Sequence, residues 1–276
     1  MGARRYLGRG ICRSLAAFTP SGCPAGHGGL LLATCLLLSS CSGGHAGAEL
    51  VVSAAASLDE PLRQVSAAFR QRHPEVKVVL NFGGSGSLAR QVERGAPVDV
   101  VIFASRREMD VLERQGLIDA RSRRDLLANR LILVVPARSA ATIAGWEDLA
   151  GVNRLAIASP EVAPLGQYSR EVLQHLNLWG PLMERVVLAR DALHVVSLVR
   201  TGNVDAAILY STSARHPEIR VVAEAPPGSH QPVVYPAAAV SSSHDPEWAR
   251  VFLEFLFEEE AEAIFRASGF ETAGGR

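Results

Sequence analysis

Two stretches near the start of the chain each place an apolar run directly before a turn of small residues and an amphipathic segment. The runs Leu50–Val52 and Val76–Leu80 are followed by turns that contain Ser57 and Ser85. This order is typical of a strand that leads straight into a helix. The first N–H groups of a helix have no partner within it, and together with the helix dipole they attract an anion. Neither turn contains lysine or arginine, so the pattern predicts an anion site built from neutral donors.

The second turn also contains three glycines, which we expect to let the backbone come close to the anion. They are Gly83, Gly84 and Gly86. The two serines have a simpler interpretation, because serine is a preferred helix N-cap and Ser57–Glu60 matches a capping box. The occurrence of such serines in two successive strand–helix units favours a shared site.

From Glu49 onward, short apolar runs alternate with helical patterns, which predicts an α/β fold with parallel sheets of strand–helix units. Leu131–Pro136 is interpreted as the strand that crosses into a second domain, and Val233–Pro236 as the strand that returns. The last helix is expected as one segment, Asp245–Ala267, with Glu258–Glu260 on its solvated face. The remaining predicted strands are Val98–Phe103, Arg154–Ala158, Asp205–Leu209 and Ile219–Ala223, and the remaining helices include Ser87–Arg94, Arg106–Gln115, Gln167–Leu176 and Asp191–Arg200.

The N-terminal region has the features of an export signal. All four cysteines precede residue 42, and an arginine-rich region precedes the apolar run Leu30–Leu38. Such a run is too short to span a bilayer comfortably and suits the core of a signal peptide. The Leu-Ser-Ser-Cys sequence that ends at Cys41 resembles the lipobox of bacterial lipoproteins, in which the signal is cut before the cysteine and the thiol is acylated. We expect a signal peptide at 1–40, a tether at 41–48 and a lipid anchor on Cys41; an ordinary secretory signal cut a few residues later is the alternative.

Composition argues against several classes of function. The 276 residues carry no net charge, so we expect neither a nucleic-acid footprint nor a polybasic membrane patch. The eight histidines show no metal-ligand spacing and no cysteine follows Cys41, so no cation site is expected. Asp191 is interpreted as a helix cap.

Five short motifs occur in the order seen in periplasmic molybdate-binding proteins, the receptors of molybdate ABC importers, and the chain resembles that family over Glu49–Glu271. The motifs are Ala54–Leu58, Phe82–Gln91, Gly95–Asp99, Pro164–Tyr168 and Ile208–Tyr210. The resemblance implies a two-lobed α/β fold, the type II periplasmic-binding-protein fold, with the ligand in the cleft between the lobes. With the crossing strands named above, lobe I would comprise 49–131 and 233–276, and lobe II 132–232.

The resemblance also implies a role for each site residue. Ser57 and Ser85 would each offer a hydroxyl and a backbone N–H from lobe I, Leu165 and Ala192 a backbone N–H from lobe II, and Tyr210 its phenolic O–H. Several such donors can hold a dianion without a cation, because hydrogen bonds to a charged acceptor are worth about 1.5–3 kcal/mol each. The implied partners are molybdate or tungstate and the permease of an ABC importer. The implied protein is a monomer without cofactor, in the periplasm or at the cell surface.

The residues leave other functions open. A receptor for another oxyanion or a small carboxylate would use the same donors, and a sensory or adhesive lipoprotein would keep the fold without transport. A serine hydrolase is disfavoured because Gly83–Ser87 is not Gly-x-Ser-x-Gly, and no histidine follows in a recognisable triad context. We therefore expect a binding protein and not an enzyme.

Overall fold

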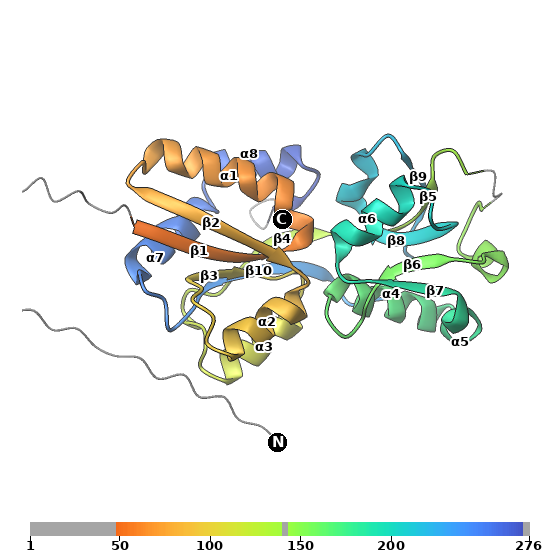
Figure 1. The fold of residues 1–276 in the computed structure, drawn as a ribbon, viewed down its shortest axis with the longest axis horizontal. Helices are drawn as coiled ribbons and strands as arrows, with labels where there is room; N and C mark the ends of the chain where they lie inside the picture. The colour runs from red at the N-terminus through yellow and green to blue at the C-terminus, as the bar shows by residue number, and fades with distance from the viewer. Residues whose placement is uncertain (1–47, 140–142, 273–276) are drawn as a thin grey trace, which may run out of the picture. The chain divides into compact units, whose positions relative to one another are not determined.

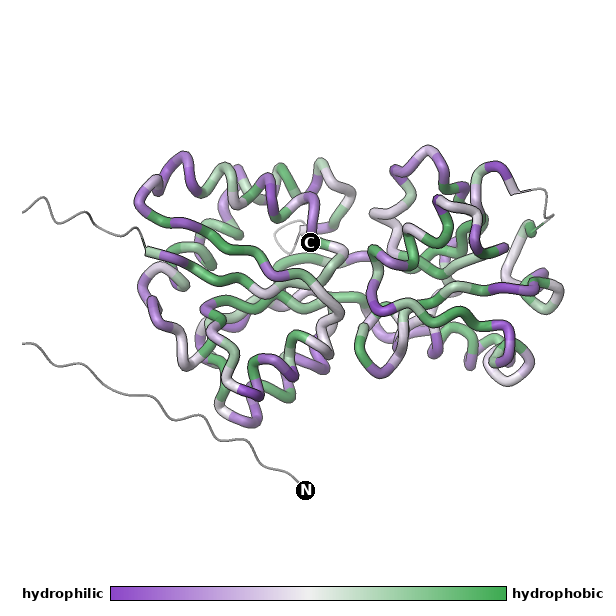
Figure 2. Tube along the Cα trace, in the orientation of Figure 1, coloured by the Kyte–Doolittle hydropathy of each residue, from purple (hydrophilic) through white to green (hydrophobic). Residues whose placement is uncertain are grey.

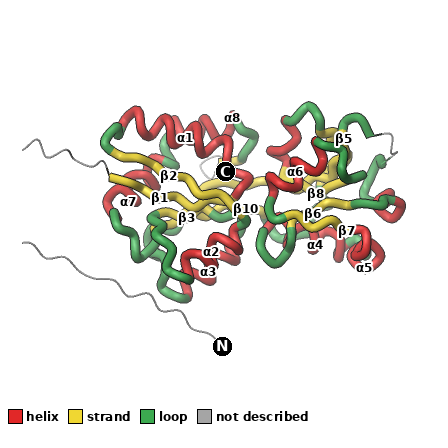
Figure 3. Tube along the Cα trace, viewed as in Figure 1, coloured by secondary structure: helices red, strands yellow, loops and turns green. Residues whose placement is uncertain are grey.

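The computed structural model describes residues 48–139 and 143–272. The predicted signal peptide, Cys41 and all but the last residue of the predicted tether lie outside the described residues. Among the helices that are described, none is long and apolar enough to cross a membrane. The described residues belong to one unit of the chain, which contains two sheets with helices packed on them (Figure 1, Figure 3).

The first sheet has six strands, in the order β11-β4-β10-β3-β1-β2. Three of them run parallel: β1 (Ala48–Ala55), β2 (Val76–Gly83) and β3 (Val100–Ile102). The other three pair antiparallel with their neighbours: β4 (Arg124–Asn129), β10 (Val233–Ala239) and β11 (Glu271–Thr272). We call this sheet and its helices lobe I.

Helices cover both faces of this sheet. One face carries α1 (Asp59–Arg72), α7 (Pro246–Phe255) and α8 (Glu259–Ala267), and the other carries α2 (Ser85–Glu93) and α3 (Arg106–Arg114). The side chains of a strand alternate between its two faces. Val100 and Ile102 of β3 therefore belong to the apolar cluster that includes α1, α7 and α8, and Val101 belongs to the cluster that includes α2 and α3. Figure 2 shows hydrophobic residues concentrated along the strands.

The second sheet, with its helices, forms lobe II. Its strand order is β7-β6-β8-β5-β9. β6 (Leu155–Ala158) lies parallel to β7 (Val186–Ala189) and β8 (Ala206–Tyr210), while β5 (Leu131–Pro136) lies antiparallel to β8 and β9 (Ile219–Glu224). Its α-helices are α4 (Pro164–His175), α5 (Trp179–Leu182) and α6 (Ala192–Arg200), with α4 and α6 on opposite sides of the sheet in Figure 1. Short 3₁₀ turns complete the described elements: η1 (Ala56–Leu58), η2 (Glu147–Gly151), η3 (Met183–Arg185) and η4 (Ser211–Arg215).

The chain crosses between the sheets at two points. It leaves the first sheet after Asn129 and enters the second at Leu131, and it returns between β9 and β10. At the first crossing, Asn129 pairs with Val233 and Leu131 pairs with Tyr210. The end of β8, and with it Tyr210, is therefore held beside the junction of the two lobes.

The alternation of strands and helices was predicted, but the all-parallel arrangement is wrong because the crossing strands enter each sheet antiparallel to their neighbours. Sequence reasoning also missed β4 and β7. β4 begins with the charged pair Arg124–Asp125, and β7 is a four-residue strand at a sheet edge. The charged pair interrupts the apolar pattern of β4. β7 is an apolar run as long as that of β6, which was recognised, so run length does not explain why β7 was missed.

The prediction of one long C-terminal helix is wrong. The backbone of Glu258 is extended, with φ −82° and ψ 154°, and the N–H groups of Phe257 and Glu258 donate to carbonyls three residues earlier. Helix α7 therefore ends before α8 begins. Glu258–Glu260 consequently lie at the N-terminus of α8, where they complement the helix dipole, and Glu258 forms an ion pair with Arg72 of α1.

Candidate functional site

A small hollow lies where the two lobes meet. It is lined from lobe I by Ala55, Ala56, Ser57, Gly83, Gly84, Ser85 and Ala104, and from lobe II by Ala163, Pro164, Leu165, Asp191, Ala192 and Tyr210. The fold thus brings all five sequence-predicted site residues, Ser57, Ser85, Leu165, Ala192 and Tyr210, to one hollow. Their contact with a ligand remains a prediction.

Three α-helices begin at this hollow. Ser85 is the first residue of α2, Leu165 the second of α4 and Ala192 the first of α6. The predicted start of α4 at Gln167 is wrong, because Pro164 occupies the first helical position, where its missing N–H costs nothing. Leu165 therefore offers the first N–H of that helix. The first N–H groups of a helix have no acceptor within it, so three helix N-termini converge on one small space.

The hydroxyls of the two serines do not cap these helices. The Ser85 Oγ accepts a hydrogen bond from the N–H of Ala104 at 3.0 Å, and the Ser57 Oγ lies 3.0 Å from the hydroxyl of Tyr235. Helix α1 starts at Asp59, with Leu58 at its N-cap and no side-chain cap. The capping-box interpretation of Ser57–Glu60 is therefore wrong, and each serine oxygen bonds instead to a group from another part of lobe I.

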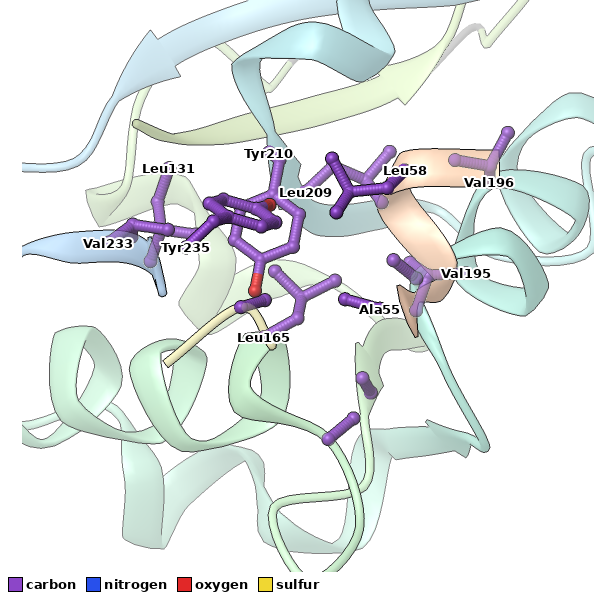
Figure 4. Packing of buried hydrophobic residues seen from close by; sticks show 14 of the residues in the cluster. Ala55, Leu58, Leu131, Leu165, Val195, Val196, Leu209, Tyr210, Val233 and Tyr235 are labelled. Carbon is purple, nitrogen blue, oxygen red and sulfur yellow. The ribbon is translucent and has the colours of Figure 1, made fainter. Parts of the chain in front are cut away.

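Tyr210 is buried at the end of β8, with 1% of its surface exposed. Its hydroxyl is buried and has no hydrogen-bond partner in the described part of the chain. Figure 4 shows its ring beside that of Tyr235 and close to Leu165. Burial raises the pKa of Tyr210 well above its ordinary value of 10.0, so the hydroxyl keeps its proton at neutral pH and is a donor without an acceptor. A buried polar group of this kind calls for a partner.

Asp191 is the N-cap of α6, as predicted: its Oδ1 accepts from the N–H of His194 at 2.9 Å. It is the single charged residue among those that line the hollow. Its other carboxylate oxygen lies 3.1 Å from the Nε of Arg190, which balances its charge. The donors that face the hollow are therefore neutral, and a bound anion would be held by hydrogen bonds and helix dipoles.

Two glycines of the second turn have a role between the lobes that the sequence did not indicate. A Cβ on Gly84 would lie 2.4 Å from the carbonyl oxygen of Val162 in lobe II, and one on Gly86 would lie 3.2 Å from the same oxygen. A Cβ on Gly83 would meet only the side chain of Leu88, at 3.3 Å. Gly84 and Gly86 thus allow the backbones of the two lobes to approach each other. The approach of these glycines to an anion stays a prediction.

Other contacts join the lobes around the hollow. Gln167 of α4 donates to Glu108 of α3 at 2.8 Å, and the hydroxyl of Tyr168 donates to the carbonyl of Ala104 at 3.3 Å. Arg90 of α2 donates to the carbonyl of Glu161. Sequence reasoning did not assign these roles, although Tyr168 lies within one of the quoted motifs. The arrangement corresponds to two lobes closed on each other.

The described residues contain no cluster of three or more histidine, cysteine, aspartate or glutamate side chains that could hold a metal ion. The chemistry of the hollow also differs from that of a cation site, which needs oxygen, nitrogen or sulfur ligands that accept. Here helix N-termini and hydroxyls supply N–H and O–H donors, and the carboxylate of Asp191 in the lining is already bonded to His194 and Arg190. Such a set suits a small ligand that presents only acceptors.

Two lobes that meet around a small hollow are an arrangement suited to the binding of a small solute. The chain belongs to the bacterial extracellular solute-binding protein family, whose model matches residues 50–271. This is a family of solute-binding receptors.

Within that family, the chain is similar to proteins named for molybdate. It is 34% identical to the molybdate-binding protein ModA of Haemophilus influenzae, over 82% of this chain and 91% of the relative. It is 32% identical to YvgL of Bacillus subtilis, which carries the name of an ABC transporter substrate-binding lipoprotein, over 87% of this chain and 93% of the relative. The structure of the periplasmic molybdate-binding protein of Azotobacter vinelandii is similar with a TM-score of 0.72 and 25% identity, covering 80% of this chain and 98% of that one.

Proposed function

We propose that this protein is an extracytoplasmic receptor that binds molybdate, and tungstate with it, and delivers the ion to an ABC importer. The observation that carries the proposal is the convergence of three helix N-termini and the hydroxyl of Tyr210 on one small hollow whose lining contains no lysine or arginine. Within the described residues, that hydroxyl has no hydrogen-bond partner. A tetrahedral dianion presents only acceptors and needs only donors. The relatives named above support molybdate as that dianion.

The proposed ligand-binding groups come from both lobes. Lobe I supplies the hydroxyl and N–H of Ser57 and Ser85, and lobe II supplies the N–H groups of Leu165 and Ala192 and the hydroxyl of Tyr210. We place the lobe boundaries at 49–131 with 233–276, and at 132–232. Because each lobe holds only part of the donor set, the ion stabilises the closed form over the open one. We further propose that the protein acts as a monomeric receptor and not as an enzyme.

Calorimetric titration of the purified protein with molybdate, tungstate, sulfate and phosphate tests this function. We expect tight and nearly equal binding of the first two ions and weak binding of the others. At a hundredfold excess over the dissociation constant, the free energy of unfolding should rise by about 2.7 kcal/mol. Scattering should show compaction on ligand addition. No heat of binding with molybdate and tungstate, together with an unchanged melting temperature, would refute the proposal.

We also propose that residues 1–40 are a signal peptide and that the mature chain is anchored by acylation of Cys41, with 41–48 as a tether. The position of this cysteine directly after the apolar run supports the anchor. Cys41→Ser should release the protein into the soluble fraction, because it removes the thiol that would be acylated. The protein should stay folded, because every other cysteine lies within the proposed signal peptide and no folded part of the chain needs a thiol. Mass spectrometry of the wild-type mature protein gives the deciding result: an N-terminus other than residue 41 contradicts the anchor.

A further inference from the structure

Tyr235 lies behind the hollow and does not line it. It is fully buried at 0% exposure, with its ring 6.0 Å from that of Tyr210 and 5.4 Å from that of Phe270, and its hydroxyl lies 3.0 Å from the Oγ of Ser57. Figure 4 shows it next to Tyr210. In a pair of hydroxyls either oxygen can donate, so the direction of this bond depends on the other groups around Tyr235.

Those groups favour Tyr235 as the donor. Asn129 lies close to its hydroxyl, and the Oδ1 of Asn129 already accepts from the N–H of Arg130 and the hydroxyl of Ser211, both at 2.8 Å. These two bonds fix the orientation of the amide. Its NH₂ group donates to the Oγ1 of Thr212 at 3.2 Å and can only donate to its remaining neighbours. The hydroxyl of Tyr210 is another neighbour, but it forms no hydrogen bond within the described residues. The proton of Tyr235 therefore has its acceptor in the Oγ of Ser57.

The direction of this bond determines what Ser57 offers to the hollow. If Ser57 donated its proton to Tyr235, only lone pairs would remain for a ligand. When Tyr235 donates, the proton of Ser57 is free and needs an acceptor of its own. Ser85 is arranged in the same way, because the N–H of Ala104 can only donate to its Oγ. Both serines thus accept from a group of lobe I and keep their protons for the ligand.

We infer that Tyr235 is a positioning residue that donates to the Ser57 Oγ, holds the Ser57 hydroxyl as a donor toward the hollow, and so selects fully deprotonated oxyanions over protonated ones. The inference rests on the proposed function, in that it takes the hollow as the oxyanion site. An oxyanion that carries a proton, such as hydrogen phosphate, would bring an O–H to a site whose serines also present O–H groups. One of those protons would be left without an acceptor.

A double-mutant cycle of Tyr235→Phe and Ser57→Ala tests the inference, with the dissociation constants of molybdate and phosphate and the melting temperature as readouts. Tyr235→Phe keeps the ring and removes the donor, and we expect it to weaken molybdate binding about tenfold. In the Ser57→Ala background the same change should have almost no further effect on binding. The ratio of phosphate to molybdate dissociation constants should fall in Tyr235→Phe. It should stay close to the wild-type ratio in Tyr210→Phe, the matched control that removes a donor without releasing Ser57.

Additive effects in the cycle, or an unchanged ratio in Tyr235→Phe, would overturn the inference while wild-type binding of molybdate still supports the proposed function. Wild-type protein that binds none of the tested oxyanions would overturn both. If Tyr235→Phe does not fold, 3-fluorotyrosine at position 235 provides the second test. It preserves the packing and makes the phenol a stronger donor, so molybdate should bind more tightly, and unchanged or weaker binding would contradict the donor role.

Discussion

Gly84→Ala is the substitution that most directly tests whether the lobes must close on the ligand. Gly84 is the N-cap of α2 in lobe I, with φ −67° and ψ 132°, a conformation that alanine adopts without strain. The substitution therefore leaves lobe I intact. Its Cβ would lie 2.4 Å from the carbonyl oxygen of Val162 in lobe II, whereas ordinary contacts begin at 3.4 Å. The new Cβ and the carbonyl oxygen are both fixed to the backbone, and neither can rotate away. The two lobes must therefore separate by about 1 Å.

The loss of affinity follows from that separation. A hydrogen bond of normal length that is stretched by about 1 Å is no longer one. Ligand donors are proposed from lobe II at Leu165, Ala192 and Tyr210, so an ion held by lobe I would lose two or more bonds. At about 1.5–3 kcal/mol for each bond to a charged acceptor, two lost bonds cost about 3–6 kcal/mol, or roughly 10²–10⁴ in the dissociation constant.

Calorimetric titration with molybdate measures this loss, and thermal unfolding without ligand checks that the variant is folded. Gly83→Ala is the matched control. It adds the same methyl group one residue earlier, where the nearest neighbour is a flexible leucine side chain at 3.3 Å, and its affinity should stay within about threefold of wild type. Scattering should show that Gly84→Ala is less compact than wild type at saturating molybdate. Wild-type affinity in a folded Gly84→Ala variant would refute the closure argument.

Four further results are expected. Tyr210→Phe should weaken molybdate binding by about 1–3 kcal/mol without lowering the stability of the ligand-free protein, because its hydroxyl has no partner to lose among the described residues; a loss of stability at unchanged affinity would assign Tyr210 to packing. Sulfate, which is smaller than molybdate, should leave about two donors unused and bind at least about a hundredfold more weakly, and calorimetric competition within about tenfold would reopen the choice of oxyanion. Because burial raises the pKa of Tyr210 above 10.0, molybdate affinity should be constant from about pH 7 to 9. The folded state also holds this proton more tightly than the unfolded chain, so the resulting stability is complete below about pH 10 and is lost as the pH rises further; denaturant unfolding across that range measures it, and a rise in stability above pH 10 would contradict the assignment.

Local rules made much of the donor set predictable. A strand, a turn of small residues and a helix start leave N–H groups unpaired wherever they occur, so Ser57 and Ser85 stood out from their own neighbours in the sequence. Asp191 was recognisable as a cap for the same reason, and it is one. Leu165, Ala192 and Tyr210 have no such local signal as ligands, and they were named through the ordered motifs of the family.

Local rules failed where chain direction depends on distant segments. The alternation of strands and helices follows from hydrophobic periodicity, but whether a strand runs parallel depends on where the chain has been before it enters the sheet. The strands that follow the crossing at Asn129–Leu131 and the return at Val233 pair antiparallel with their neighbours. Each sheet therefore contains both parallel and antiparallel strands. The break between α7 and α8 was missed similarly, because the apolar residues on both sides of Glu258 continue a helical pattern.

The sequence by itself determined the alternation of strands and helices, the helix cap at Asp191 and the absence of lysine and arginine from the two serine turns, because these depend on residues within a few positions of one another. Only the tertiary structure decided what the turn glycines and the serine hydroxyls do. Gly84 meets a carbonyl of the opposite lobe, and the Ser57 oxygen meets a tyrosine 178 residues away in the chain. Hydrogen-bond direction and steric clearance are properties of groups in contact, and the contacts between these groups exist only after the chain has crossed twice between its two sheets.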